Sequence, residues 1–329
     1  MPKERTHWIL ADKILDSPGC PELKKIISSN RNLYYVGAVA PDIPLYYLWG
    51  REKERIRKAF EKTHGKNGGN TLSFLAEFVR NYGNALPPSS WAFLSGIVCH
   101  VMADSQFHPM VIYFCGTSQD ANEAERRISS ARHNTFETYL DLHYSSKKDL
   151  LNEGLLINSL KNIEIPESLL LDIVRFYLVG MEEFPEDVIR RAIYLHAKIQ
   201  EAFSSSLAGK IITFLDLIPV LDLKDFRALF YPDREITSVP FFQKPISYRH
   251  PVTGEYRNER VEDIESRVKE EALKIFRVIE EFLTGRQTRA IGPLESLVGP
   301  RLDTGLPRKS NHAMKYFDIH DIKKMLFAS

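Results

Sequence analysis

The chain has 329 residues, of which 44 are Lys or Arg and 43 are Asp or Glu, so its formal net charge is +1. This balance excludes a global electrostatic field that would steer the protein toward nucleic acid or an anionic membrane, so any polyanion binding has to be local. The three cysteines, Cys20, Cys99 and Cys115, are odd in number and widely spaced. They exclude a disulfide framework and a thiolate zinc site, and they favour a reducing compartment.

The opening stretch MPKERTHWILADKIL becomes amphipathic at once and lacks the apolar segment and small-residue cleavage site of a secretory signal. No later run reaches the roughly 18 to 20 apolar residues that a membrane-spanning helix needs. We therefore expect a cytoplasmic protein without a transmembrane segment.

A helical period dominates the first two thirds of the chain. It predicts helices near residues 7–16, 21–29, 51–62, 70–83, 89–108, 119–144, 166–180 and 185–206. Breakers such as SPG at 17–19, NGGN at 67–70 and NALPPSS at 84–90 separate these helices. The fold class that follows is mainly α, a multi-helix bundle.

The composition changes at about residue 219. Residues 231–256, YPDREITSVPFFQKPISYRHPVTGEY, mix prolines, aromatics and turn dipeptides, which predicts a turn-rich loop or a short hairpin and makes this segment a candidate lid. A long amphipathic helix is expected at 261–285, followed by a mildly basic tail at 286–329. We divide the chain into a helical domain, 1–218, and a segment packed on it, 219–329, with one continuous domain as the alternative.

The stretch HVMADSQFHP, residues 100–109, follows an apolar run, WAFLSGIVC. Residues four apart share a helix face, so His100, Asp104 and His108 lie in one row, and Pro109 is expected to kink or end the helix. Burying such groups is costly unless they are paired or bind a cation. Taken alone, the row indicates either side chains paired with one another or a metal site, so the other candidate ligands decide between the two.

A second pair, His133 and Glu137, shares a face of the helix expected at 119–144. Further candidates lie at breaks: Asp42 in GAVAPDIP, His64 in KTHGKNGG, and His7 at the start of the first helix. Facing His and carboxylate pairs build polynuclear metal sites in helical bundles. Nitrogen and oxygen ligands suit zinc, with manganese and iron as alternatives.

These residues, in this order, resemble the bacterial zinc-dependent phospholipase C family, whose fold is shared with the single-strand-specific zinc nucleases. The resemblance covers roughly residues 5–145. It implies two or three zinc ions per chain. The implied first site is Asp42, His64, His100 and Asp104; the second is His108, His133 and Glu137; and Asp104 bridges to a third ion shared with His7. In the secreted relatives the third ion also uses an N-terminal tryptophan, which has no counterpart in MPKERTH.

The resemblance implies a zinc-dependent phosphodiester hydrolase, most specifically one that cleaves a glycerophospholipid head group, with Asp42 as the general base. One alternative is a nuclease or nucleotide phosphodiesterase on the same metal site, which the near-zero net charge disfavours. Another is a non-catalytic zinc-binding protein, since structural zinc sites are closed. Peripheral contact with a membrane and the oligomeric state are left open by the sequence.

Overall fold

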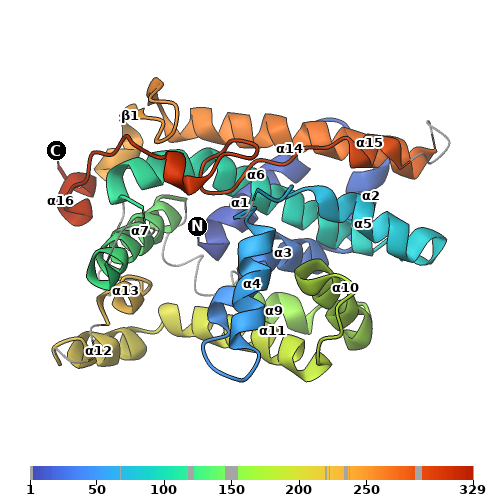
Figure 1. Cartoon of the computed structure of the whole chain (residues 1–329), viewed down its shortest axis with the longest axis horizontal. Coiled ribbons are helices and arrows are strands. Elements are labelled where there is room, and N and C mark those ends of the chain that lie inside the picture. The colour runs from blue at the N-terminus through green and yellow to red at the C-terminus, as the bar shows by residue number, and fades with distance from the viewer. Residues whose placement is uncertain are drawn as a thin grey trace.

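The computed structural model describes residues 3–66, 68–117, 122–144, 155–218, 221, 223–232, 236, 238–285 and 291–328. Helices account for most of these residues, and one two-stranded hairpin accompanies them (Figure 1). The expected mainly α fold is therefore confirmed. The division at residues 218 and 219 stays a prediction.

The N-terminal half contains α1 (Glu4–Leu15), α2 (Pro21–Ser29), α3 (Arg31–Val39), the 3-10 helix η1 (Ala40–Tyr46), α4 (Lys53–Thr63), α5 (Ser73–Tyr82), η2 (Gly83–Ala85), α6 (Ser90–Cys115) and α7 (Glu123–Tyr144). The second half contains α9 (Leu156–Lys161), α10 (Glu167–Val179), α11 (Glu186–Phe203), α12 (Ser206–Leu215), α13 (Lys224–Arg227), η3 (Pro240–Gln243), β1 (Ile246–Arg249), β2 (Tyr256–Glu259), α14 (Val261–Thr284), α15 (Gly292–Glu295), η4 (Asn311–Ala313) and α16 (Ile322–Leu326).

Helix α6 is the centre of the bundle. Almost every residue of it is buried, as expected for a helix that is apolar on all sides. It contacts α1, α2, α3, α7 and α14, and α14 runs alongside it in Figure 1. Its closest neighbour is α3, because Gly96 of α6 faces the backbone of Tyr34 and Gly37 of α3 faces the backbone of Phe93. Neither crossing point has room for a side chain.

The predicted helix end at residue 108 is wrong, because α6 continues through Pro109 to Cys115. Pro109 has no N–H to donate to the carbonyl of Ser105, one turn earlier. Gly305, from the C-terminal segment, packs against that carbonyl so closely that a Cβ on Gly305 would lie 2.3 Å from the Ser105 oxygen. Tertiary packing on all sides therefore holds the helix together where local sequence predicts a stop.

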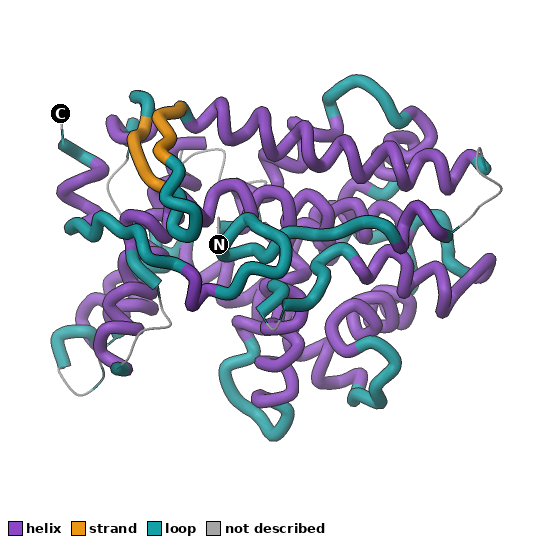
Figure 2. Tube along the Cα trace, turned by 45° about the horizontal axis from the view of Figure 1, so that its top comes forward, coloured by secondary structure: helices purple, strands orange, loops and turns teal. Residues whose placement is uncertain are grey.

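The expected hairpin is confirmed: β1 pairs antiparallel with β2, with Ile246 opposite Glu259. Four positions of the 231–256 segment, 233–235 and 237, lie outside the described residues. The long helix α14 ends at Thr284, one residue before the predicted end. Beyond α15 the chain crosses α6 through loops and turns, teal in Figure 2, and forms the short helix η4 before α16.

No helix within the described parts of the chain combines the length and the apolar character that crossing a bilayer requires.

Candidate metal centre

The structure brings all eight predicted ligand residues together from five segments. His7 comes from α1, Asp42 from η1, and His64 from the residue that follows α4. The remaining five come from the two central helices: His100, Asp104 and His108 from α6, and His133 and Glu137 from α7. The three residues of α6 share one face of the helix because they are four residues apart, and this face is turned toward the other ligands.

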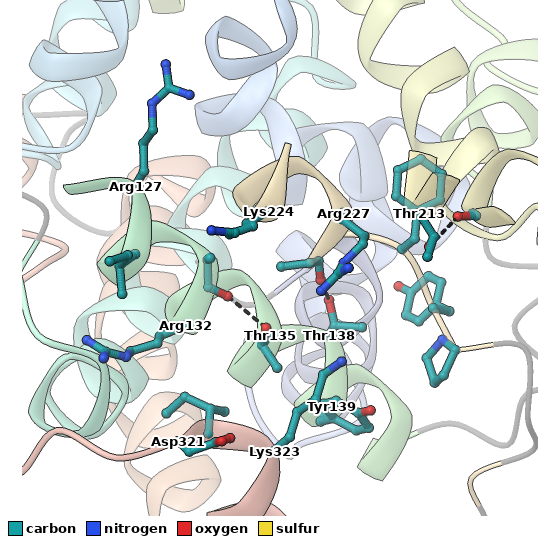
Figure 3. A pocket seen from close by; sticks show the side chains of 18 of the residues that line it. Arg127, Arg132, Thr135, Thr138, Tyr139, Thr213, Lys224, Arg227, Asp321 and Lys323 are labelled. Atoms are coloured by element: carbon teal, nitrogen blue, oxygen red, sulfur yellow. Dashed lines mark hydrogen bonds between the residues drawn. The ribbon is translucent and has the colours of Figure 1, made fainter. Parts of the chain in front are cut away.

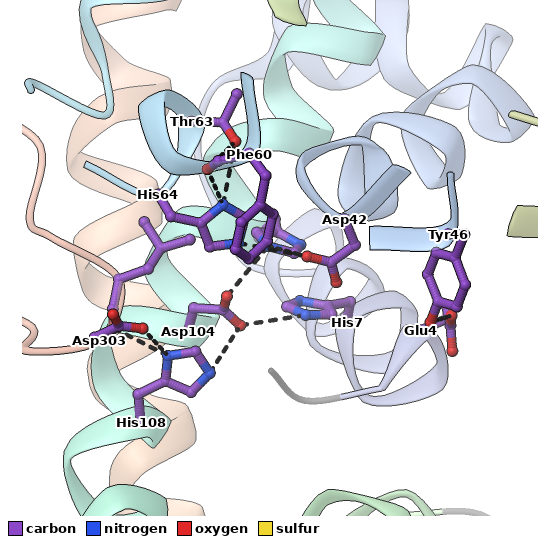
Figure 4. Close-up of polar contacts among 12 residues, drawn as sticks. Glu4, His7, Asp42, Tyr46, Phe60, Thr63, His64, Asp104, His108 and Asp303 are labelled. Carbon is purple, nitrogen blue, oxygen red and sulfur yellow. Dashed lines mark hydrogen bonds and ion pairs between the residues drawn. The ribbon is translucent and has the colours of Figure 1, made fainter. Parts of the chain in front are cut away.

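Asp104 lies in the middle of the larger group (Figure 4). Its two carboxylate oxygens lie 3.3 Å from Nε2 of His7 and 3.2 Å from Nε2 of His100. Asp42 faces the same space, with Oδ1 3.5 Å from Nε2 of His64 and 3.7 Å from Nε2 of His100. The imidazoles of His7 and His100 stack with their ring centroids 4.1 Å apart. These five side chains surround one small volume.

The second group joins α6 to α7. Nε2 of His133 lies 2.7 Å from Oε1 of Glu137, and Nε2 of His108 lies 3.7 Å from the same oxygen. His108 also lies 3.9 Å from Oδ1 of Asp104, so it connects the two groups. One ligand atom from each of His108, His133 and Glu137 lies within 4.8 Å of the others, which is close enough to hold one ion.

Several buried atoms of His7, Asp42, His100, Asp104 and His108 lack a hydrogen-bond partner in the described chain. Seven buried atoms of these side chains have no hydrogen-bond partner within the described chain: Nδ1 and Nε2 of His7, Oδ1 of Asp42, Nε2 of His100, both carboxylate oxygens of Asp104, and Nε2 of His108. They approach one another within ion-pair distance but are not aligned for hydrogen bonds. Buried polar atoms are almost always satisfied, and each one left alone costs about 1–3 kcal/mol. A cation among them satisfies the whole set, so the residues fit a metal cluster.

Three histidines are oriented through their second nitrogen. Nδ1 of His100 donates to the carbonyl of Ala38 over 2.9 Å, and Nδ1 of His64 donates to the carbonyl of Phe60 over 2.9 Å. Nδ1 of His108 donates to the carbonyl of Leu302 over 3.2 Å. A carbonyl can only accept, so each Nδ1 carries the hydrogen, and Nε2 is the nitrogen left to bind a cation in the cluster. This arrangement is typical of metal-binding histidines.

The electrostatics of the cluster also favour a cation. Burial lowers the pKa of His7 to about 4 and lowers the pKa of His64 well below its ordinary value, so both imidazoles are neutral. Burial on its own lowers the pKa of His100, but the carboxylates of Asp104 and Asp42 outweigh it and raise this pKa to about 9. Burial likewise opposes ionisation of Asp104, but the charges of His100 and His108 hold its pKa well below the ordinary value. The buried carboxylates therefore require positive charge beside them.

The C-terminal segment contributes a site residue that sequence reasoning missed. Oδ1 of Asp303 lies 3.8 Å from Nδ1 of His108, and its other oxygen accepts a hydrogen bond from the amide of Asn311. The side chain is 19% exposed, so it is near the surface of the cluster. Asp303 belongs to a Pro- and Gly-containing stretch without a helical period, and no local signal distinguishes it from other loop acids.

A second buried network fixes the start of α1, close to His7. Glu4 accepts a hydrogen bond from the hydroxyl of Tyr46 over 2.7 Å, and its carboxylate lies 2.9 Å from Nε2 of His196. The ring of Tyr46 stacks on that of His196 with centroids 4.0 Å apart. Nothing in the local sequence distinguishes His196 from any other histidine of an amphipathic helix. The structure shows a contact that ties α11 to α1 and η1.

Asp141, one turn after Glu137 on α7, fixes the start of α1 relative to α7. Its carboxylate accepts hydrogen bonds from the backbone N–H of Thr6 over 2.9 Å and from the hydroxyl of Tyr231 over 2.6 Å. His7 is the next residue after Thr6, so its position relative to α7 is set by this contact.

A mainly helical bundle with a buried cluster of imidazoles and carboxylates is typical of a polynuclear metalloenzyme. The chain belongs to the zinc-dependent phospholipase C family, whose model matches residues 6–177, just over half of its length. All eight predicted ligand residues lie inside the matched region. Comparison with curated proteins and with solved structures finds no match.

Proposed function

We propose that this protein is a zinc-dependent phosphodiesterase that hydrolyses the head-group phosphodiester of a glycerophospholipid. The observation that carries the proposal is the set of seven buried side-chain atoms without hydrogen-bond partners, which come from α1, η1 and α6. Membership of a family of zinc-dependent phospholipases C supports both the metal and the class of substrate. The predicted cytoplasmic location remains a proposal.

The distances support the proposed second ion directly and the first in part, because Asp42 groups with His7 and His100. His64, His100 and Asp104 form one group of ligand atoms, and His108, His133 and Glu137 form another. His7 forms a third group with Asp42 and His100, and it also lies 3.3 Å from Asp104. We propose that these groups hold two or three zinc ions. Clustered zinc ions lower the pKa of bound water and stabilise the attacking and leaving oxygens of an in-line displacement at phosphorus.

Asp42 is our candidate for the general base. Among the three predicted carboxylates its side chain is the most exposed, at 8%, against 0% for Asp104 and 4% for Glu137. Burial raises the pKa of Asp42 well above its ordinary value, which makes its carboxylate a better proton acceptor. Its Oδ1 has no hydrogen-bond partner and faces the cluster, so it is oriented to take a proton from a water there.

The proposal is tested with zinc-loaded protein and a panel of glycerophospholipids, by measuring release of the phosphorylated head group and of diacylglycerol. We expect release by the wild type and none by Asp104→Asn, which keeps the shape of the side chain but removes the central charge. Exposed Asp187 provides the matched control, because Asp187→Asn makes the same chemical change outside the cluster. No release from any lipid by the zinc-loaded wild type would contradict the phospholipase assignment.

The second candidate, a nuclease or nucleotide phosphodiesterase, would use the same cluster. Single-stranded DNA is therefore included in the same assay, and acid-soluble nucleotides are measured. Nucleotide release that His100→Ala abolishes, without lipid hydrolysis, would favour this candidate. A zinc-loaded protein inactive on both substrates would favour a structural role for the metal.

A further inference from the structure

A large groove lies away from the metal cluster. Its volume is about 1120 Å³, and it is bounded by α7, α12, α13 and the start of α16 (Figure 3). From α7 it is lined by Ala131, Thr135 and Thr138, whereas His133 and Glu137 of the same helix belong to the cluster. Because these two sets lie on different faces of α7, the groove is a separate surface feature.

Basic side chains predominate in this groove, which we call the basic groove. Its cationic lining residues are Arg127, Arg132, Lys210, Lys224, Arg227 and Lys323. Asp321 is the one carboxylate that lines it. Two arginines also form ion pairs at its margin, Arg127 with Glu123 at 3.0 Å and Arg227 with Asp216 at 2.9 Å. The lining thus carries a local excess of positive charge that the net charge of +1 conceals.

Helix α12, on one side of the basic groove, has no buried residue. Large apolar side chains are exposed along this helix and the turn after it; we call Leu207, Ile211, Phe214, Leu217, Ile218 and Leu221 the α12 stripe. Leu207, Phe214 and Leu217 are 70%, 69% and 72% exposed. The helical members are four and three residues apart, so they share one face, and Phe214 and Leu217 also line the groove.

The stripe is unusual for this protein. Sixteen large apolar side chains are exposed in the described parts of the chain, and six of them lie between residues 207 and 221. Soluble proteins rarely expose contiguous apolar patches, and a patch bordered by charged residues marks a site of interaction. An exposed apolar helix face with cationic side chains beside it is the pattern of helices that lie in the interface of a membrane.

We infer that the α12 stripe and the basic groove dock the protein on a membrane surface that contains anionic lipids. The aliphatic side chains and Phe214 enter the boundary between head groups and acyl chains, and the lysines and arginines contact phosphate groups. The inference rests on the proposed function for the identity of the partner, since a phospholipid hydrolase meets its substrate at such a surface. The inferred contact with the membrane is made by a face of the protein that contains none of the proposed zinc ligands.

Two other occupants fit the charges less well. A second copy of the chain in a twofold contact would bring one set of cationic side chains close to another. A nucleic acid would match the positive charge, but it would leave the aliphatic members of the stripe exposed to water. An anionic membrane accounts for both the charged and the apolar halves of the surface.

The test is sedimentation of the full chain with vesicles of phosphatidylcholine plus phosphatidylglycerol, and with vesicles of phosphatidylcholine alone. We expect binding to the anionic vesicles that weakens with salt. The variant Phe214→Asp/Leu217→Asp should bind at least about ten-fold more weakly, because two apolar side chains no longer enter the interface. Lys210→Glu/Lys224→Glu should lose the preference for anionic vesicles. Met181→Asp is the matched control, since Met181 is 75% exposed outside the stripe and the groove.

A second measurement uses a protein with an almost unchanged surface. Cys20, Cys99 and Cys115 are all buried, so a thiol-reactive, environment-sensitive fluorophore labels Phe214→Cys or Met181→Cys at the introduced position. On addition of anionic vesicles we expect a blue shift for the label at position 214 and none for the label at position 181. A shift at neither position would overturn the inference even if the aspartate variants fail to fold.

The docking surface and the proposed function fail in different ways. Hydrolysis of a monomeric, short-chain phosphatidylcholine should be the same for the wild type and the stripe variant. Vesicle binding that depends on the stripe, without any hydrolysis of this lipid by the zinc-loaded wild type, would support the surface and contradict the function. Equal vesicle binding by wild type and stripe variant would overturn the surface. A wild type that forms a dimer without lipid, while the stripe variant stays monomeric, would also overturn the surface. Binding of single-stranded DNA but not of vesicles would overturn it as well.

Discussion

The carbonyl oxygen of Leu302 accepts a hydrogen bond from Nδ1 of His108 over 3.2 Å, although the two residues are 194 positions apart. The C-terminal segment thereby orients an imidazole of the candidate metal centre. The contact is supported by the N–H of Leu302, which donates to the carbonyl of His64 over 3.4 Å, and by the packing of Gly305 on α6. The segment beyond residue 291 is therefore part of the site, although the family match ends at residue 177.

Gly305→Ala should weaken zinc binding by about 10–100-fold, the usual cost of disturbing the groups that orient metal ligands. A Cβ at this position would lie 2.3 Å from the carbonyl oxygen of Ser105, so the segment that carries Leu302 has to move away from α6. The control is Gly285→Ala. Gly285 has φ +68°, close to the +66° of Gly305, but no atom lies within 4 Å of its added Cβ. Zinc affinity is measured by competition with a chelator, and equal affinities for the two variants would contradict the prediction.

Asp42→Asn should lower kcat by about 10²–10⁴-fold, the usual contribution of a general base. The amide has nearly the same size as the carboxylate but cannot accept the proton of an attacking water. The measurement is head-group release at saturating substrate, together with the zinc content of the same sample. A kcat within ten-fold of the wild type, with zinc retained, would remove Asp42 from the proposed role.

Gly96→Ala should lower the free energy of unfolding by about 1–3 kcal/mol, as overpacking does in cores. The new Cβ would lie 2.1 Å from the carbonyl oxygen of Tyr34 and 2.6 Å from the nitrogen of Ala38. The displacement also moves Ala38, whose carbonyl orients His100, so zinc affinity should fall together with stability. Urea unfolding of Gly292→Ala, whose Cβ would meet no atom within 4 Å, gives the baseline. Equal stability of both variants would show that α3 and α6 are less closely packed than the structure has them.

The Glu4 network predicts a dependence of stability on acid. Burial on its own raises the pKa of Glu4, but the hydrogen bond and charge of His196 outweigh it and lower this pKa to about 2. An unfolded Glu titrates near its ordinary value of 4.5, so between these two values the unfolded state binds more protons. The contribution of Glu4 is therefore complete above about pH 4.5 and is lost as the pH falls toward about 2.

Glu4→Gln should remove this contribution, so the difference in free energy of unfolding between wild type and variant should shrink as the pH is lowered. The comparison uses urea unfolding of metal-free samples, because release of zinc in acid would add its own pH dependence. A difference that stays constant or grows with acidification would contradict the assigned pKa shift of Glu4.

Much of the helical framework could be predicted because strong 3.6-residue periods determine it. Helix α2 has the predicted bounds, and α10 and α11 begin one residue from theirs. Helix α3 and η1 could not be predicted, because the glycines and prolines of the apolar stretch 37–44 are local turn signals. Their helical form depends on close packing against α6, which is a tertiary effect. Helix α12 was not predicted either. Its sequence is mostly apolar, so it shows little difference between an apolar and a polar face from which a helical period could be recognised.

The candidate site was predictable only where ligands share a helix. The spacing of four places His100 beside Asp104 and His133 beside Glu137 without any knowledge of the fold. The approach of His7, Asp42 and His64 followed from the family resemblance, because nothing in their local sequence relates them to α6. Asp303 could be found by neither route, since it reaches His108 through a loop contact between distant segments.

Zinc content per chain, measured by mass spectrometry on dialysed protein, tests the central claim that eight side chains from five segments converge on a cluster of divalent cations. The account predicts two or three zinc ions per chain for the wild type and for Asp187→Asn, and clearly fewer for Asp104→Asn. A wild type without bound zinc after exposure to the metal, or the same zinc content in Asp104→Asn as in the wild type, would contradict it.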